Sequence, residues 1–302
     1  MTSITPHLWF DRDAVEAAEL YTSVLPDSRV TDVTTLRNTP SGDTDVVTFE
    51  LCGQRFQAIS AGPLFRFTPA ISFAVRCGSA EEVDRLWEVL ADRGNALMPL
   101  GEYPFSERFG WTEDRYGLSW QLMAVGDEPI GQRIVPMLLF TGEVCGRAEE
   151  AMRFYASVFP DSEVGEIARY GADAAPDAEG TVMYGSFTVA GQELAAMDSA
   201  HTHEFGFNEA VSLMVGCDSQ EELDRYWEQL SALPEAEQCG WLKDRFGVSW
   251  QIVPNQLDEY LARGSEEQIA RVTEAFLRMK KFDLAELRAA YEGAQAPMGG
   301  AR

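Results

Sequence analysis

Apolar and polar residues alternate in one stretch that occurs twice along the chain. Residues 110–121 read GWTEDRYGLSWQ and residues 240–251 read GWLKDRFGVSWQ, with eight of the twelve positions identical. After the Asp-Arg-aromatic-Gly turn, Trp120 and Gln121 fall on opposite faces of a predicted strand, as Trp250 and Gln251 do. The chain is therefore predicted to be a tandem duplication in which each repeat ends with such a strand.

The remaining pattern predicts the same order of elements in both repeats. A strand over residues 4–10, a helix from residue 14 and a hairpin over 47–60 precede a strand at 71–75 and a second helix after residue 79. Asp13 and Ser79, each followed three residues later by Glu, are predicted to begin the helices as N-caps. Residues 31–45 and 98–109, which are polar or rich in aromatics, are predicted to be connections.

This order of strands and helices predicts an α+β fold built from βαβββ units. The predicted domains are residues 1–127, residues 130–255 and a helical extension at 256–302, where the repeat stops and amphipathic stripes follow.

Charge and cysteine usage narrow the function classes. The chain has 24 basic and 49 acidic residues, a net charge of −25, which disfavours nucleic acids and anionic membranes as partners. Its five cysteines form no CxxC pair, so neither a disulfide framework nor a structural zinc site is indicated. With no signal-peptide pattern and no apolar run approaching the ~20 residues of a membrane span, a cytoplasmic protein is predicted.

The motifs resemble those of the vicinal oxygen chelate (glyoxalase/bleomycin-resistance) superfamily, and of its PhnB-like branch, often called 3-demethylubiquinone-9 3-methyltransferase. The resemblance rests on ITPHLWFD at residues 4–11, AAELY at 17–21 with PDS at 26–28, both repeated stretches, and MKKFDL at 279–284. It implies two tandem glyoxalase-like modules of paired βαβββ units. Their curved mixed sheets would form a cup for a small molecule.

The resemblance also implies where a metal would lie. In metal-using relatives one ligand comes from the first strand of a module and a Glu from the last. Here Gln121 and Gln251 match the last-strand position. The nearest match to the first-strand position is Thr5 or His7 in the first repeat and Val135 or Met137 in the second. A site of two His and two carboxylates cannot be assembled from these positions, although a divalent metal stays open as a cofactor.

Other residues are candidates on chemistry alone. His201 and His203 are two residues apart, so an extended segment would put both on one side as a metal pair, with Asp198 as a third ligand; the alternative is a polar loop. Trp111 and Trp241 are candidates for stacking a planar ligand in the cup, with packing as the alternative. The Asp-Arg pairs of the repeated stretch are interpreted as turns rather than anion clamps.

Three functions follow as hypotheses. The first is a chelate-type protein that binds or transforms a small molecule, and as an enzyme polarises a carbonyl or enediolate with a metal. The second is a metal-free module that sequesters a planar or hydrophobic ligand, which the glutamines favour. The third is a scaffold that binds a partner through the C-terminal helices.

The methyltransferase name has no support in the residues, because no Gly-rich loop closes a strand with an acidic residue ~20 positions on. Units can pair within one chain or across a homodimer.

Overall fold

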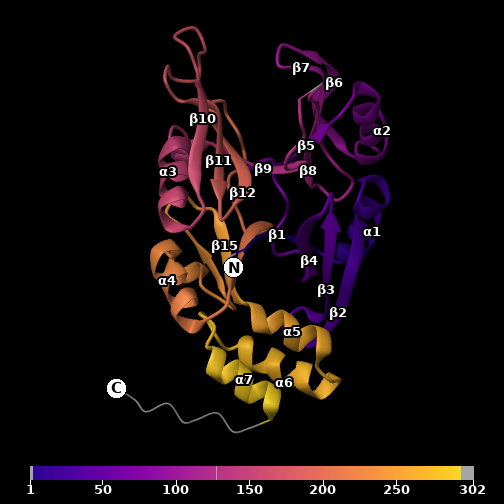
Figure 1. The fold of residues 1–302 in the computed structure, drawn as a ribbon, viewed down its shortest axis with the longest axis vertical. Helices are drawn as coiled ribbons and strands as arrows, with labels where there is room; N and C mark the ends of the chain where they lie inside the picture. The colour runs from indigo at the N-terminus through magenta and orange to yellow at the C-terminus, as the bar shows by residue number, and fades with distance from the viewer. Residues whose placement is uncertain (1–2, 127, 294–302) are drawn as a thin grey trace.

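The structure, a computed structural model, describes residues 3–126 and 128–293. Two curved mixed sheets, here called A and B, form the body of the protein, and helices cover their outer sides (Figure 1). Residues 294–302 of the predicted C-terminal extension lie outside the described residues.

Sheet A has seven strands and draws them from both repeats. In spatial order these are β14 (Trp241–Lys243), β15 (Ser249–Pro254), β13 (Val211–Cys217), β1 (Ser3–Phe10), β4 (Gln54–Ser60), β3 (Gly42–Leu51) and β2 (Arg29–Thr39). The two repeats meet where β1 pairs antiparallel with β13. Sheet A therefore joins the first unit of repeat one to the second unit of repeat two.

Sheet B has eight strands and joins the remaining two units, the second of repeat one and the first of repeat two. In spatial order these are β10 (Glu163–Arg169), β11 (Val182–Val189), β12 (Gln192–Asp198), β9 (Ile134–Phe140), β5 (Ile71–Cys77), β8 (Ser119–Ala124), β7 (Ser106–Glu113) and β6 (Asn95–Tyr103). The antiparallel pair of β5 and β9 joins the repeats here. The pairing of units, which the sequence left open, thus occurs within one chain and between the repeats.

Four helices pack on the outer faces because alternate strand residues there are apolar. They are α1 (Ala14–Val24), α2 (Ala80–Leu90), α3 (Ala148–Val158) and α4 (Gln220–Leu230). On β1, Ile4, Leu8 and Phe10 are buried in the main core. The other face of each sheet, which we call its inner face, is turned away from these helices.

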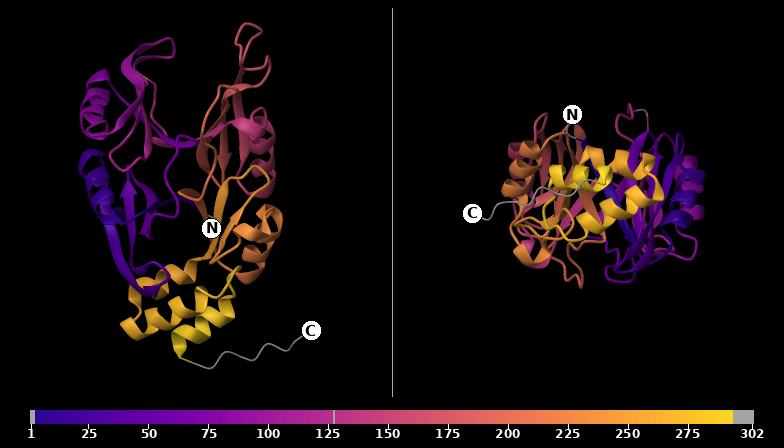
Figure 2. Two further views of the ribbon diagram at one scale, coloured as in Figure 1. Left: turned by 180° about the vertical axis from the view of Figure 1, so that it is seen from behind. Right: turned by 90° about the horizontal axis from the view of Figure 1, so that it is seen from below.

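The C-terminal helices α5 (Asn255–Arg263), α6 (Glu266–Phe276) and α7 (Leu284–Glu292) cross one end of the molecule (Figure 2). Asp258 of α5 pairs with Arg55 of β4 at 2.7 Å, and the backbone N–H of Cys239 donates to Met279 O at 2.8 Å. Because α5 contacts both β2 and β15, this extension ties the two sides of sheet A together.

Three local predictions were wrong. Residues 31–45 lie in the β2–β3 hairpin, and residues 98–109 lie in the β6–β7 hairpin. Asp13 makes no side-chain hydrogen bond at the start of α1, whereas Ser79 caps α2 as predicted. A polar or irregular pattern is typical of edge strands as well as of loops, because an edge strand buries little of its surface.

None of the helices in the described ranges is both long and apolar enough to cross a membrane.

Candidate functional site

The repeated Asp-Arg-aromatic-Gly sequence forms a buried turn in each repeat. The Asp244 carboxylate accepts hydrogen bonds from Tyr155 Oη at 2.7 Å and Trp250 Nε1 at 2.8 Å, and from the backbone N–H of Phe246 and Val248. Gly247 supplies the left-handed backbone that the turn requires, with φ +87°. Burial raises the pKa of Asp244, and the four donated bonds act in the opposite direction. These bonds explain the repeated residues as a structural turn.

The first repeat builds the same network around Asp114. Tyr21 Oη donates to its carboxylate at 2.6 Å and Trp120 Nε1 at 2.9 Å. Tyr21 belongs to α1, which packs on sheet A, whereas Trp120 belongs to β8 of sheet B. The turn therefore holds the two sheets together within a repeat, while the strand pairing holds the repeats together within a sheet.

A row of polar side chains crosses the inner face of sheet A. Residues directly opposite in neighbouring strands share a face, and the register aligns Thr48, Gln57, His7, Ser212, Ser249 and Lys243 across six strands. We call this the polar row. The adjacent row contains Thr5, Met214, Gln251 and Trp241. The two rows bring candidates His7, Gln251 and Trp241 onto one surface.

His7 lies at the centre of this surface without a partner for its Nδ1. Its side chain is 3% exposed, and burial lowers its pKa to about 3, so the imidazole is neutral at pH 7. Trp241 meets the imidazole edge-on with ring centroids 5.3 Å apart, and Trp9 lies 6.0 Å from Trp241. Ser249 Oγ, in the same polar row, is also buried and unpaired. Two such atoms on one face are exceptional, because buried polar groups are nearly always hydrogen-bonded.

The inner face of sheet B differs from that of sheet A at the equivalent positions. Met137 and Ala195 stand where sheet A has His7 and Gln57, and they pack with Ala74 and Val135 in a small apolar cluster. Trp111 Nε1 donates to Ser119 Oγ at 2.7 Å, whereas Trp241, its equivalent, lies against His7. At these positions the duplication has therefore produced a polar surface on sheet A and an apolar one on sheet B.

Both repeated glutamines lie on the inner faces and are held by serines. Gln121 Nε2 donates to Ser72 Oγ at 2.8 Å, and Gln251 Nε2 donates to Ser212 Oγ at 2.9 Å. The amide oxygens are neutral, and neither row of sheet A contains a carboxylate to balance a divalent ion. The donor atoms at the positions that a metal would use therefore fit a divalent metal poorly. They support no chemical step that uses a metal.

Replacing Gln251 by Glu is expected to create a measurable divalent-metal site, because a carboxylate would then share the surface with neutral His7. Gln121→Glu is the matched control, since its surroundings offer Met137 in place of a histidine. Zinc and nickel titrations by calorimetry of both variants check this. Equal affinities for the two variants would show that His7 is not placed to act as a ligand.

The second predicted metal site comprises Asp198, His201 and His203. In the structure each of these side chains already has a polar partner. Both Asp198 oxygens accept backbone N–H bonds, among them Gly146 N at 2.7 Å and Val182 N at 2.9 Å. His203 Nε2 bonds Ser199 Oγ at 2.8 Å, and exposed His201 lies 3.7 Å from Asp177. Across residues 3–126 and 128–293, no three His, Cys, Asp or Glu side chains are grouped to hold a metal. This metal site stays a prediction.

Sequence reasoning missed Gln57, Ser249 and Trp9 as members of the inner surface. Gln57 stands between Phe56 and Ala58, which are buried in the core, so its alternation was a usable signal for the opposite face. Trp9 follows His7 by two residues and therefore shares its face. No comparable signal marks Ser249 as unpaired, because that depends on where the ring of Trp241 lies.

Comparisons with known proteins agree with this architecture. A sequence model of the family described as 3-demethylubiquinone-9 3-methyltransferase matches residues 2–123 and again 132–253. The PhnB protein from Bacillus cereus is 42% identical over 40% of this chain and 98% of its own, with a TM-score of 0.38. Glyoxalase I from Zea mays is 11% identical over 87% of this chain and 98% of its own, with a TM-score of 0.52. No curated protein matches the chain.

The two curved mixed sheets and their order of strands define a glyoxalase-like protein, with the same fold as glyoxalase I. More particularly, the chain belongs to the 3-demethylubiquinone-9 3-methyltransferase family, and it carries two PhnB-like domains in tandem.

Proposed function

We propose that the protein binds a small, neutral and planar molecule on the inner face of sheet A without the help of a metal. The observation that carries this proposal is the pair of buried, unpaired atoms, His7 Nδ1 and Ser249 Oγ, on one polar row. A ligand that bonds both atoms would remove the cost of leaving them unpaired, which is about 1–3 kcal/mol for each.

The neighbouring side chains set the chemistry of this ligand. Trp241 and Trp9 offer aromatic surface beside His7, which suits a planar body. Neutral His7 has one nitrogen that donates and one that accepts, and a serine hydroxyl does both. A hydroxyl or carbonyl group on an aromatic or quinoid ring is therefore the complementary ligand chemistry. This supports the metal-free binding hypothesis over metal-assisted catalysis.

Saturation-transfer NMR with a panel of naphthols, coumarins and naphthoquinones tests the proposal. At least one compound is expected to bind, and His7→Met, which installs the residue of sheet B, is expected to weaken it by about tenfold, the loss of one hydrogen bond. Met137→Leu on sheet B is the matched control and should leave the affinity unchanged. Binding that survives His7→Met but is lost in Met137→Leu would move the site to the other sheet.

A further inference from the structure

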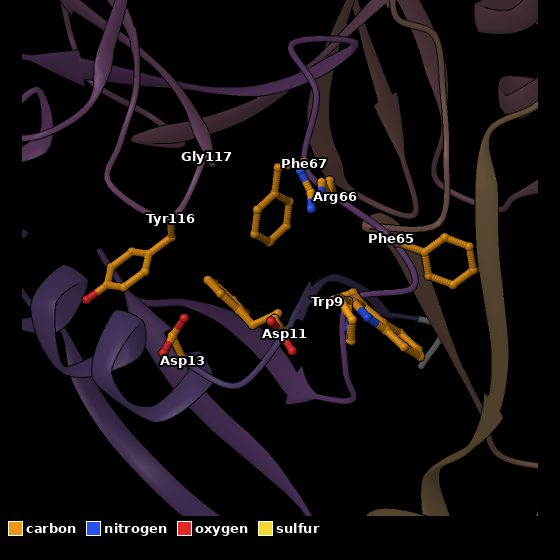
Figure 3. Close-up of a pocket in the computed structure, with 10 residues that line it drawn as sticks. Trp9, Asp11, Asp13, Phe65, Arg66, Phe67, Tyr116 and Gly117 are labelled. Atoms are coloured by element: carbon orange, nitrogen blue, oxygen red, sulfur yellow. The ribbon is translucent and has the colours of Figure 1, made fainter. Parts of the chain in front are cut away.

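A pocket lies where β1 ends, and it shares Trp9 with the inner surface of sheet A. It encloses about 320 Å³, within the lower part of the ~300–1,000 Å³ range of small-molecule sites. Its walls are largely aromatic and include Trp9, Phe65, Phe67 and Tyr116. In Figure 3, Tyr116 and Phe67 reach the pocket from above, and the carboxylates of Asp11 and Asp13 face them from below.

In the second repeat, side chains of the protein itself fill the equivalent place. Tyr116 corresponds to Phe246, and Asp13, before α1, corresponds to Arg147, before α3. The Arg147 guanidinium carbon lies 4.6 Å from the centre of the Phe246 ring. Arg147 is held there by Glu150, with N···O distances of 2.9 and 3.0 Å. The second repeat thus contains an aromatic ring, a cation and a carboxylate in contact.

The first repeat keeps the ring and the carboxylate but has an acidic residue at the position of Arg147. Glu16, the equivalent of Glu150, accepts a hydrogen bond from Tyr116 Oη at 2.8 Å. The position of Arg147 is taken by Asp13, whose carboxylate caps no helix. The four-residue difference in the loop, which places the short helix η1 (Gly142–Val144) only in repeat two, accompanies this change. The first repeat therefore lacks an equivalent of the Arg147 guanidinium beside this ring.

We propose that this pocket binds a small organic cation, a primary or quaternary ammonium group. Cations are attracted to the faces of aromatic rings, and quaternary ammonium compounds bind in aromatic cages of this kind. Asp11 and Asp13 add opposite charge. Asp11 lies 3.8 Å from exposed Arg12, and the pocket also contains Arg66, which forms no ion pair within the described ranges. The rival occupant is therefore an anion paired with Arg66. This pocket includes neither His7 nor Ser249, so the proposal does not rest on the two unpaired atoms of sheet A.

Calorimetry with choline tests the proposal, with 3,3-dimethylbutan-1-ol as its uncharged counterpart of the same shape. Choline is expected to bind one site per chain, and the alcohol about tenfold more weakly, because it lacks the charge. Asp13→Arg, which copies the second repeat, is expected to abolish choline binding by supplying an internal cation. The isosteric Asp13→Asn should weaken it severalfold without disturbing the fold.

The controls separate this site from its alternatives. Phe246→Leu changes the equivalent ring in the second repeat and should leave choline binding unchanged, as should His7→Met. Equal binding of choline and the alcohol would overturn the proposal, because charge would play no part. So would choline binding that is unaffected by both Asp13 variants, or saturable binding of benzoate in place of choline, which would assign the pocket to Arg66.

Discussion

Replacing Asp244 by alanine is expected to lower the free energy of unfolding by about 3–5 kcal/mol, because four buried donors lose their acceptor together. These donors are Tyr155 Oη, Trp250 Nε1 and two backbone N–H groups, and Asp244 itself is 1% exposed. Urea denaturation followed by tryptophan fluorescence measures the change. Asp114→Ala should have an effect of similar size in the first repeat, since its contacts are the same in kind.

Tyr155→Phe is the graded control for this prediction. It removes one hydrogen bond and keeps the ring, so a loss of about 1–2 kcal/mol is expected. A loss in Asp244→Ala no larger than that in Tyr155→Phe would mean that the carboxylate is not the centre of the network. The repeated Asp would then need an explanation outside stability.

Acidification from pH 7 to pH 5 is expected to destabilise the protein through His7 by roughly 2 kcal/mol. The pKa of His7 is about 3 in the folded protein and 6.5 in the unfolded chain, so the unfolded state binds the proton first. The stability contributed by neutral His7 is therefore complete above pH 6.5 and is lost as the pH falls toward 3. Urea midpoints of the wild type and His7→Met at the two pH values measure the difference in slope.

His201→Gln is the control for this pH dependence, because the His201 side chain is 62% exposed. It should retain the wild-type slope, whereas His7→Met should lose roughly 2 kcal/mol of it. Identical slopes for all three proteins would show that the His7 imidazole accepts a proton in the folded state, and hence that its surroundings are more polar than the structure shows.

The sequence predicted the helices and strands better than it predicted which strands pair with each other. The repeated stretch, the tryptophan and glutamine faces and the Ser79 cap depend on residues close together in the chain, where periodicity and capping rules apply. The exchange of units between repeats has no such local signal, because β1 pairs with β13 from the far end of the chain. The polar strand β2 was likewise mistaken for a loop, since edge strands need no apolar alternation.

For the candidate site, too, single residues could be predicted but their surroundings could not. His7, Gln251 and Trp241 were named individually from strand periodicity and the family resemblance, and the register brings them onto one face. What distinguishes sheet A from sheet B was only partly visible in the sequence, because the contrast of His7 with Met137 could be read from it but the repeats share their serines, glutamines and tryptophans. The difference arises from His7 and Gln57 replacing Met137 and Ala195, and from the ring of Trp241 leaving Ser249 unpaired.

The most direct test of binding at His7 is a two-dimensional ¹⁵N–¹H NMR spectrum of histidine side chains, recorded with and without the tightest compound of the panel. The chain has three histidines, so each imidazole can be assigned by substitution. We expect the Nδ1 resonance of His7 to shift on binding, while the resonances of His201 and His203 do not change. A bound compound that leaves His7 unchanged, or shifts only the other two histidines, would contradict it.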